Sequence, residues 1–227
     1  MECVVISGAT GGIGSHLALR ALESGYGVIG LSRRPPEKDP GYPIHAVDVT
    51  DGAAVAAFYR SLRGRRVWAL INAAGAASMN LLLTTPSATM SRLVGVNLLG
   101  AMHCCAEGAK LLVRRKGGRI INFSSIVTAL GTPGESVYAA CKAGVEVFSR
   151  CLAAELSFFN ITVNTVAPPP IDTPMLAGLT REQIDKIVQR QIIKRQAVPE
   201  DVWNTVSFLL DEKSAMLTGE VLHIGGI

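Results

Sequence analysis

Tyr138 and Lys142 are the residues whose types and spacing most clearly could do chemistry. They stand four positions apart, so on a helix a phenol and an ammonium would share one face. At about 4 Å and an effective dielectric of about 20, the attraction between ammonium and phenolate is roughly 4 kcal/mol. That energy would bring the pKa of a tyrosine from about 10 toward neutrality. We expect such a phenol to give a proton to a carbonyl oxygen or take one from an alcohol. An ordinary surface pair is the alternative reading of this spacing.

The start of the chain predicts a site for phosphates beside this pair. An apolar strand, Cys3–Ser7, leads into Gly8-Ala9-Thr10-Gly11-Gly12-Ile13-Gly14 and then into an amphipathic helix ending near Gly25. Glycines permit a tight turn and a close backbone approach, and the free N–H groups and the dipole of the helix favour negative charge there. Between a first strand and a first helix, this pattern indicates dinucleotide binding.

The second expected strand, 27–32, indicates which dinucleotide. An acidic residue that binds the adenosine ribose usually ends this strand in NAD-preferring proteins. This chain has Ser32, Arg33 and Arg34 instead, so two guanidiniums are available for a 2′-phosphate. We therefore expect NADPH or NADP⁺ rather than NAD. The alternative is that Arg33 and Arg34 are only loop charges before Pro35. Asp48, after a strand at 44–47, is placed to hydrogen-bond the adenine edge.

The remaining chain alternates strands and helices. Further strands are expected at 67–71, 119–123, 161–166 and 220–224, and helices at 51–62, 86–113, 138–158 and 199–210, with Asp51 as an N-cap. This alternation predicts one α/β domain over 1–227, with a doubly wound, mostly parallel seven-stranded sheet of the Rossmann type and helices on both faces. Residues 172–195 are predicted to form a pair of short helices and a substrate lid. The apolar residues of this segment are Met175, Leu176, Leu179 and Ile187. They would either line the substrate site or only contribute to packing.

Composition bounds the partners. The 227 residues carry a net charge of +4, which is weak support for nucleic acid, and no apolar run reaches the ~18 residues that span a bilayer. Five cysteines without CxxC spacing predict neither a disulfide framework nor a metal site. From the charge and the lack of a long apolar run, we expect no nucleic-acid or membrane partner. No signal peptide is visible, so we expect a cytoplasmic protein.

Taken together, the chain resembles a short-chain dehydrogenase/reductase over essentially its whole length. Gly8, Gly12 and Gly14 match the family's TGxxxGxG turn, with Ser7 where threonine is usual. Asn72-Ala73-Ala74-Gly75 matches its NNAG segment with one substitution. The set Asn97, Ser125, Tyr138 and Lys142 matches its catalytic Asn-Ser-Tyr-Lys residues, with the serine thirteen positions before the tyrosine.

The resemblance implies a role for each residue of this set. Tyr138 would be the general acid in reduction or the base in oxidation, and Lys142 would lower its pKa and bind the nicotinamide ribose. Ser125, favoured over Ser124 by the thirteen-residue spacing, would donate to the substrate carbonyl. Asn97 would hold a water that links Lys142 to solvent. The implied cofactor contacts are Gly8, Thr10, Gly11, Gly12, Ile13, Gly14, Ser32, Arg33, Arg34, Asp48, Val49, Asn72, Ala73, Ala74, Gly75, Tyr138, Lys142, Pro168, Ile171 and Thr173.

Within the family the chain is most similar to 3-oxoacyl-(acyl-carrier-protein) reductases. This similarity implies reduction of a ketone such as a carrier-protein- or CoA-linked 3-oxoacyl thioester, in fatty-acid or polyketide biosynthesis, by a homotetramer or homodimer. Three features depart from the pattern: Pro169 follows Pro168 where glycine is usual, Ile224 precedes Gly225 where aspartate is usual, and Phe158-Phe159 stand where a basic residue is common. Two alternatives remain, an alcohol dehydrogenase of the same family and a catalytically impaired dinucleotide-binding regulatory protein.

Overall fold

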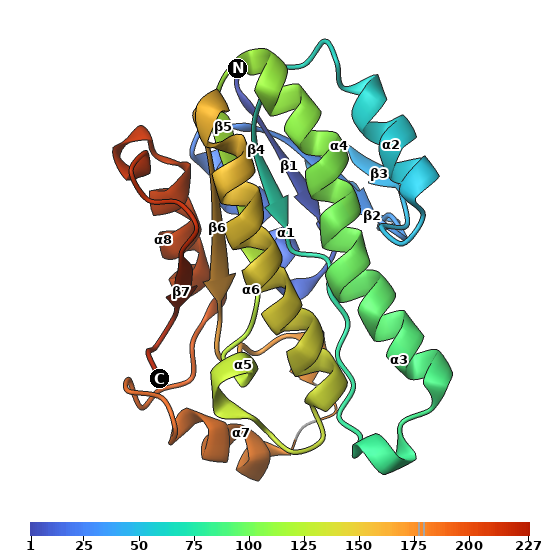
Figure 1. Ribbon diagram of the computed structural model, residues 1–227, viewed down its shortest axis with the longest axis vertical. Coiled ribbons are helices and arrows are strands. Elements are labelled where there is room, and N and C mark those ends of the chain that lie inside the picture. Colours follow the sequence, from blue (N-terminus) through green and yellow to red (C-terminus); the bar gives the residue numbers. More distant parts are fainter. Residues whose placement is uncertain (177, 179) are drawn as a thin grey trace.

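The computed structural model describes residues 1–176, 178 and 180–227, and a seven-stranded parallel sheet forms its centre (Figure 1). The strand order is β3-β2-β1-β4-β5-β6-β7, which confirms the predicted doubly wound Rossmann-type sheet. The chain passes outward from β1 to β3 and then returns to the other side of β1, so the order reverses between β1 and β4. Ligands of such sheets bind beyond the carboxyl ends of the strands at this switch point. The strands are β1 Cys3–Ser7, β2 Gly27–Ser32, β3 Ile44–Ala46, β4 Val67–Asn72, β5 Gly118–Phe123, β6 Ile161–Ala167 and β7 Val221–His223.

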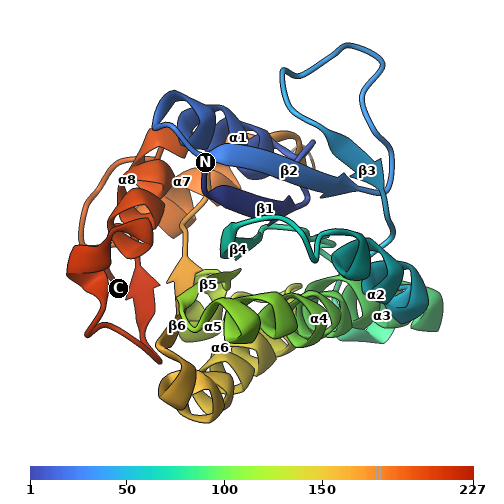
Figure 2. The same cartoon turned by 90° about the horizontal axis from the view of Figure 1, so that it is seen from above.

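Helices cover both faces of the sheet (Figure 2). On one face lie α1 (Gly12–Glu23) and α8 (Pro199–Leu210), and on the other lie α2 (Gly52–Ser61), α4 (Gly100–Arg115) and α6 (Ser136–Leu156). The central strands β4 and β5 are buried along their whole length because each is covered on both sides. This explains why the sequence of β4 is a nearly continuous apolar run rather than an alternating pattern.

Two helix starts follow their sequence signals. The Asp51 side chain accepts hydrogen bonds from the N–H groups of Ala53 and Ala54 at 2.9 and 3.0 Å, which caps α2 as predicted. Pro199 occupies the first turn of α8, where a missing N–H costs nothing.

The long helix expected at 86–113 is not regular. It consists of α3 (Ser87–Val94), a π-helical turn over Gly95–Leu99, and α4, which continues to Arg115. The sequence showed no sign of this widened turn, which lies around Asn97.

The expected pair of short helices over 172–195 is present in shorter form. A 3₁₀ turn at Pro174–Leu176 and α7 at Arg181–Val188 lie beyond the carboxyl ends of the strands, near α5 (Val127–Leu130) (Figure 1). Thr180 and Gln183 form a reciprocal capping box at the start of α7. Leu179 and the side chain of Met175, both expected in the apolar lining, lie outside the described residues.

Trp68 marks the opposite end of the sheet, near the start of β4. The guanidinium groups of Arg115 and Arg119 both lie over its ring, at 4.9 and 4.8 Å from the ring centroid. Its Nε1 donates to the carbonyl of Leu210 at 3.0 Å, which ties β4 to the end of α8. The other tryptophan, Trp203, is buried in α8.

None of the described helices combines the length and apolar character needed to cross a membrane. Across the same residues, no group of three or more histidine, cysteine or acidic side chains gathers as it would around a metal ion. All five cysteines are free thiols.

Candidate active site

The glycine turn after β1 is packed so tightly that side chains would not fit in it. Gly8 has φ +71°, and a Cβ on it would lie 2.7 Å from the Cα of Ala74. A Cβ on Gly14 would lie 2.2 Å from the carbonyl oxygen of Gly8, and one on Gly12 would lie 2.5 Å from Cγ2 of Thr173. The turn therefore brings bare backbone to the N-terminus of α1, which suits a phosphate group.

A cavity of about 570 Å³ opens over this turn. Its volume and its glycine-lined floor suit an extended dinucleotide. Most of the cofactor contacts predicted from the sequence line it, namely Gly8, Thr10, Gly11, Gly12, Ile13, Gly14, Ser32, Arg33, Asp48, Val49, Ala73, Ala74, Gly75 and Thr173.

The rim at the end of β2 presents guanidinium groups. Arg33 lines the cavity and is exposed, whereas Arg34, which we also predicted, lines neither this cavity nor the next. Arg92 of α3 lines the cavity instead, and the sequence reasoning did not single it out. Asp48 is the one carboxylate among the described lining residues. Its pKa is lowered, chiefly by a hydrogen bond from the backbone of Thr50.

Asn72 lies behind the cavity rather than in its wall. Its amide donates to Oδ1 of Asn122 at 2.8 Å and contacts the thiol of Cys105, and Asn122 in turn donates to Ser149 at 2.8 Å. This buried chain of polar groups links β4 and β5 to α4 and α6. The predicted cofactor contact from Asn72 is therefore not seen in the lining of either cavity.

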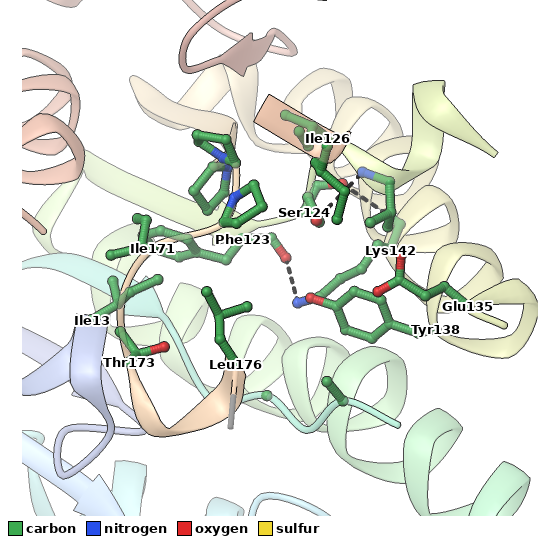
Figure 3. Close-up of a pocket in the computed structure, with 18 of the residues that line it drawn as sticks. Ile13, Phe123, Ser124, Ile126, Glu135, Tyr138, Lys142, Ile171, Thr173 and Leu176 are labelled. Carbon is green, nitrogen blue, oxygen red and sulfur yellow. Dashed lines mark hydrogen bonds between the residues drawn. The ribbon is translucent and has the colours of Figure 1, made fainter. Parts of the chain in front are cut away.

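A second, mostly apolar cavity of about 250 Å³ adjoins the first (Figure 3). The two cavities are direct neighbours, because five residues line both: Ile13, Ala73, Gly75, Ala77 and Thr173. The walls of the second cavity include Ser125, Tyr138 and Lys142 together with the predicted Pro168, Ile171, Leu176 and Ile187.

Tyr138 and Lys142 lie on one face of α6, as their spacing predicted. Lys142 Nζ lies 5.7 Å from the centroid of the Tyr138 ring and donates a hydrogen bond to the carbonyl of Phe123 at 2.9 Å (Figure 3). Both side chains are buried, yet both line the cavity. The ammonium is thus held by the end of β5 beside the phenol.

The expected lowering of the Tyr138 pKa is not produced by these protein groups. Burial raises the pKa of Tyr138, and the charge of Glu135 raises it further. Burial also lowers the pKa of Lys142, from 10.5 to about 8. The prediction was wrong because it counted the attraction of the ammonium and left out the loss of water around the phenol, which disfavours phenolate.

The structure distinguishes the two neighbouring serines. Ser125 lines the cavity together with Tyr138, and its hydroxyl acts to lower the pKa of the tyrosine. Ser124 lines the cavity as well, but its hydroxyl donates to the carboxylate of Glu146, which also accepts from Thr128 at 2.9 Å. Ser124 therefore anchors the loop to α6, and Ser125 is the hydroxyl next to the phenol, as the thirteen-residue spacing favoured.

Asn97 is buried in the π-helical turn, and its side chain is fully used by the backbone. Its Oδ1 accepts from the N–H of Ala76 at 3.1 Å, and its Nδ2 donates to the carbonyls of Ala76 and Leu93 at 2.8 and 3.0 Å. The side chain thus clamps the loop after β4, which lines the nucleotide cavity. A water-holding role for Asn97 stays a prediction, and its side-chain amide has no further donor to offer.

Three site residues escaped the sequence reasoning. Arg92 gave no signal because it lines the cavity from α3, far along the chain from the glycine turn. Glu146 gave none because it binds Ser124 and Thr128, which are 22 and 18 positions earlier. Glu135 lies only three residues before Tyr138, and that spacing on a helix could have drawn attention to it.

Comparison with known proteins gives consistent matches. A family model described as enoyl-(acyl carrier protein) reductase matches residues 8–226. The chain is 32% identical over 238 residues to the 3-oxoacyl-[acyl-carrier-protein] reductase FabG of Staphylococcus epidermidis, covering 99% of this chain and 98% of the relative.

Two solved structures share the architecture. Ligand-free aldohexose dehydrogenase of Thermoplasma acidophilum matches with a TM-score of 0.90 and 26% identity, covering 99% of this chain and 93% of that one. ElxO with NADP bound matches with a TM-score of 0.88 and 28% identity, covering 98% and 96%.

Proposed function

The chain belongs to the short-chain dehydrogenase/reductase family, and we propose that it is an NADPH-dependent reductase of ketones, most readily of a 3-oxoacyl thioester. One observation carries the proposal: the apolar cavity that holds Ser125, Tyr138 and Lys142 adjoins the glycine-lined cavity and shares five lining residues with it. A carbonyl in the first would thus lie next to a nicotinamide reaching in from the second. The acyl-carrier-protein relatives support the thioester.

The cofactor fits the residues present. The glycine turn offers backbone that a Cβ would obstruct, and Ser32 and Arg33 stand at the rim of the cavity where a 2′-phosphate would lie. With no acidic residue at the end of β2 to repel that phosphate, NADPH is favoured over NADH. The NADP-bound ElxO neighbour supports the same choice.

Each catalytic side chain has a physical task. NADPH supplies the hydride when it is bound, and the protein positions and polarises the ketone. Ser125 donates to the carbonyl oxygen and stabilises its growing negative charge. Tyr138 then gives its phenolic proton to that oxygen. Lys142, held by the Phe123 carbonyl, places a positive charge beside the phenolate that remains.

Burial keeps Tyr138 protonated, which is the form that can give a proton to a carbonyl oxygen, whereas oxidation of an alcohol needs the phenolate as a base. The 3-oxoacyl reductase relatives support placing ketone reduction ahead of alcohol oxidation as the activity of this site.

We also propose that the protein assembles as a homotetramer or homodimer through its long helices. Leu99 at the start of α4 and Val147 of α6 are exposed, and Phe158 after α6 is 93% exposed. Because these helices lie side by side on one face of the molecule (Figure 1), a second copy would cover them.

The test is NADPH oxidation with 3-oxoacyl thioesters and a panel of plain ketones. The proposal expects turnover that is lost in Tyr138→Phe, while NADPH still binds that variant. Absence of turnover with every carbonyl, despite tight NADPH binding, would favour the regulatory alternative. Full activity of Tyr138→Phe would refute the catalytic assignment.

A further inference from the structure

Glu135 is an unusual residue in the wall of the apolar cavity. It is the one acidic side chain among the described lining residues, and it precedes α6, three positions before Tyr138 (Figure 3). Around it the walls are largely aliphatic, with Ile126, Val127 and Leu176 among them. A carboxylate on such a wall needs a physical reason, because burying its charge is costly.

Helix capping does not supply that reason. Glu135 occupies the N-cap position of α6, but its side chain makes no capping hydrogen bond; only its backbone carbonyl accepts, from the N–H of Ala139 at 2.7 Å. Within the described part of the chain, no lysine, arginine or histidine lies within ion-pair distance of its carboxylate.

The hydrogen bonding of the carboxylate is incomplete. Its Oε2 is buried and has no hydrogen-bond partner among the described residues. The hydroxyl of Thr132 acts to lower the pKa of Glu135, but burial outweighs this effect and the pKa is raised. A donor brought by a ligand would stabilise the charged form and offset this cost.

Glu135 lies in the same small cavity as the reacting group. Glu135, Tyr138 and Ser125 all line this cavity (Figure 3), and the charge of Glu135 raises the pKa of Tyr138. A substrate whose carbonyl sits at Tyr138 and Ser125 would therefore share the cavity with this carboxylate. In a cavity of about 250 Å³ with apolar walls, a single acceptor of this kind matches a mostly apolar ligand that carries one donor.

We propose that Glu135 determines substrate specificity by accepting a hydrogen bond from an N–H or O–H group of the substrate. This inference rests on the proposed ketone reductase function and narrows its substrate class to apolar ketones with one nearby donor. Two sources share this chemistry: the secondary amide of a pantetheine-like thioester arm, and a hydroxyl on the ketone chain itself.

Matched substrates separate these sources. The first pair is the 3-oxobutanoyl thioester of N-acetylcysteamine and the same thioester with its amide nitrogen methylated, which removes the N–H. The second pair is a hydroxyketone and its methyl ether. For each pair, kcat/KM is compared in the unmodified protein, Glu135→Gln and Glu135→Met. Glu155→Gln, an exposed glutamate on the same helix, is the matched control.

In one of the two pairs, the unmodified protein should prefer the donor-bearing member by about 10- to 100-fold, the range for a hydrogen bond to a charged group. Glu135→Gln, which keeps an acceptor oxygen, should retain part of this preference. Glu135→Met should bring the ratio near one by slowing only the donor-bearing member. The control should match the unmodified protein, and all variants should bind NADPH equally.

A preference that survives in Glu135→Met, or none in either pair, would overturn the inference. The same pairs are compared by equilibrium binding to the Tyr138→Phe protein with NADPH, which needs no turnover. If no ketone is reduced but a donor-bearing probe still binds more tightly, the proposed function fails and the role of Glu135 stands. Equal binding of both members of each pair, or no binding at all, would refute the proposed role of Glu135.

Discussion

Replacing Lys142 with methionine should change how the stability of the protein depends on pH. The Lys142 side chain is buried, and burial lowers the pKa of its ammonium from 10.5 to about 8. This difference corresponds to about 3 kcal/mol of destabilisation whenever Lys142 is charged in both the folded and the unfolded chain. Its hydrogen bond to the Phe123 carbonyl offsets part of this cost.

The sign follows from proton binding. Below pH ~8 both states hold the proton, and the full cost is present. Between pH ~8 and ~10 the folded protein releases it while the unfolded chain keeps it, so the unmodified protein gains stability as the pH rises. Lys142→Met has no such group. The free energy of unfolding of the unmodified protein, minus that of the variant, should therefore rise by about 2–3 kcal/mol between pH 7 and pH 10.

Urea unfolding of both proteins at a series of pH values measures this difference. Groups common to both proteins cancel in the subtraction. Lys110→Met, which alters an exposed lysine on α4, is the control and should give a flat difference. A flat difference for Lys142→Met as well would refute the claim that the folded protein holds this ammonium at a cost. The variant should also lose ketone reduction while remaining folded.

Three further substitutions test other parts of the site. Ser125→Ala should lower kcat/KM for ketones by about 100-fold through loss of a donor to the carbonyl oxygen, whereas Ser124→Ala should mainly lower the melting temperature; the reverse pattern would contradict the assignment of the two hydroxyls. Arg33→Gln should weaken NADPH binding by about 10-fold and leave NADH unchanged, as measured by calorimetry; equal effects on both would show that Arg33 is only a loop charge. Gly12→Ala should weaken binding of both cofactors and cost about 1–3 kcal/mol of stability in denaturant unfolding, because the new methyl would lie 2.5 Å from Cγ2 of Thr173. Unchanged binding would show that the turn can shift to make room for the methyl.

The sheet and the glycine turn could be predicted from the sequence because their causes are local. Buried parallel strands such as β4 must be apolar on both faces, and a turn as tight as that at Gly8 and Gly14 must be glycine. Such requirements can be recognised from the residue types within a short stretch of sequence. The same holds for Asp51, which caps α2, and for Pro199 in the first turn of α8.

The interior of the site was harder to predict because its geometry and its pKa values depend on residues that are far apart in the sequence. The π-helical turn lies around Asn97, whose side chain binds Ala76, a residue 21 positions earlier. The pKa of Tyr138 is set by the loss of water around the folded phenol, which no spacing records. Arg34 and Asn72 have suitable chemistry but lie away from the cavities.

The position of Trp68 at the opposite end of the sheet from the active site determines what tryptophan fluorescence reports for this protein. Neither Trp68 nor Trp203, the two tryptophans of the chain, lines either cavity of the active site. Their emission should therefore follow the loss of packing during unfolding and respond to bound NADPH only by energy transfer across the molecule. One optical signal thus reports folding without being altered by direct contact with a ligand.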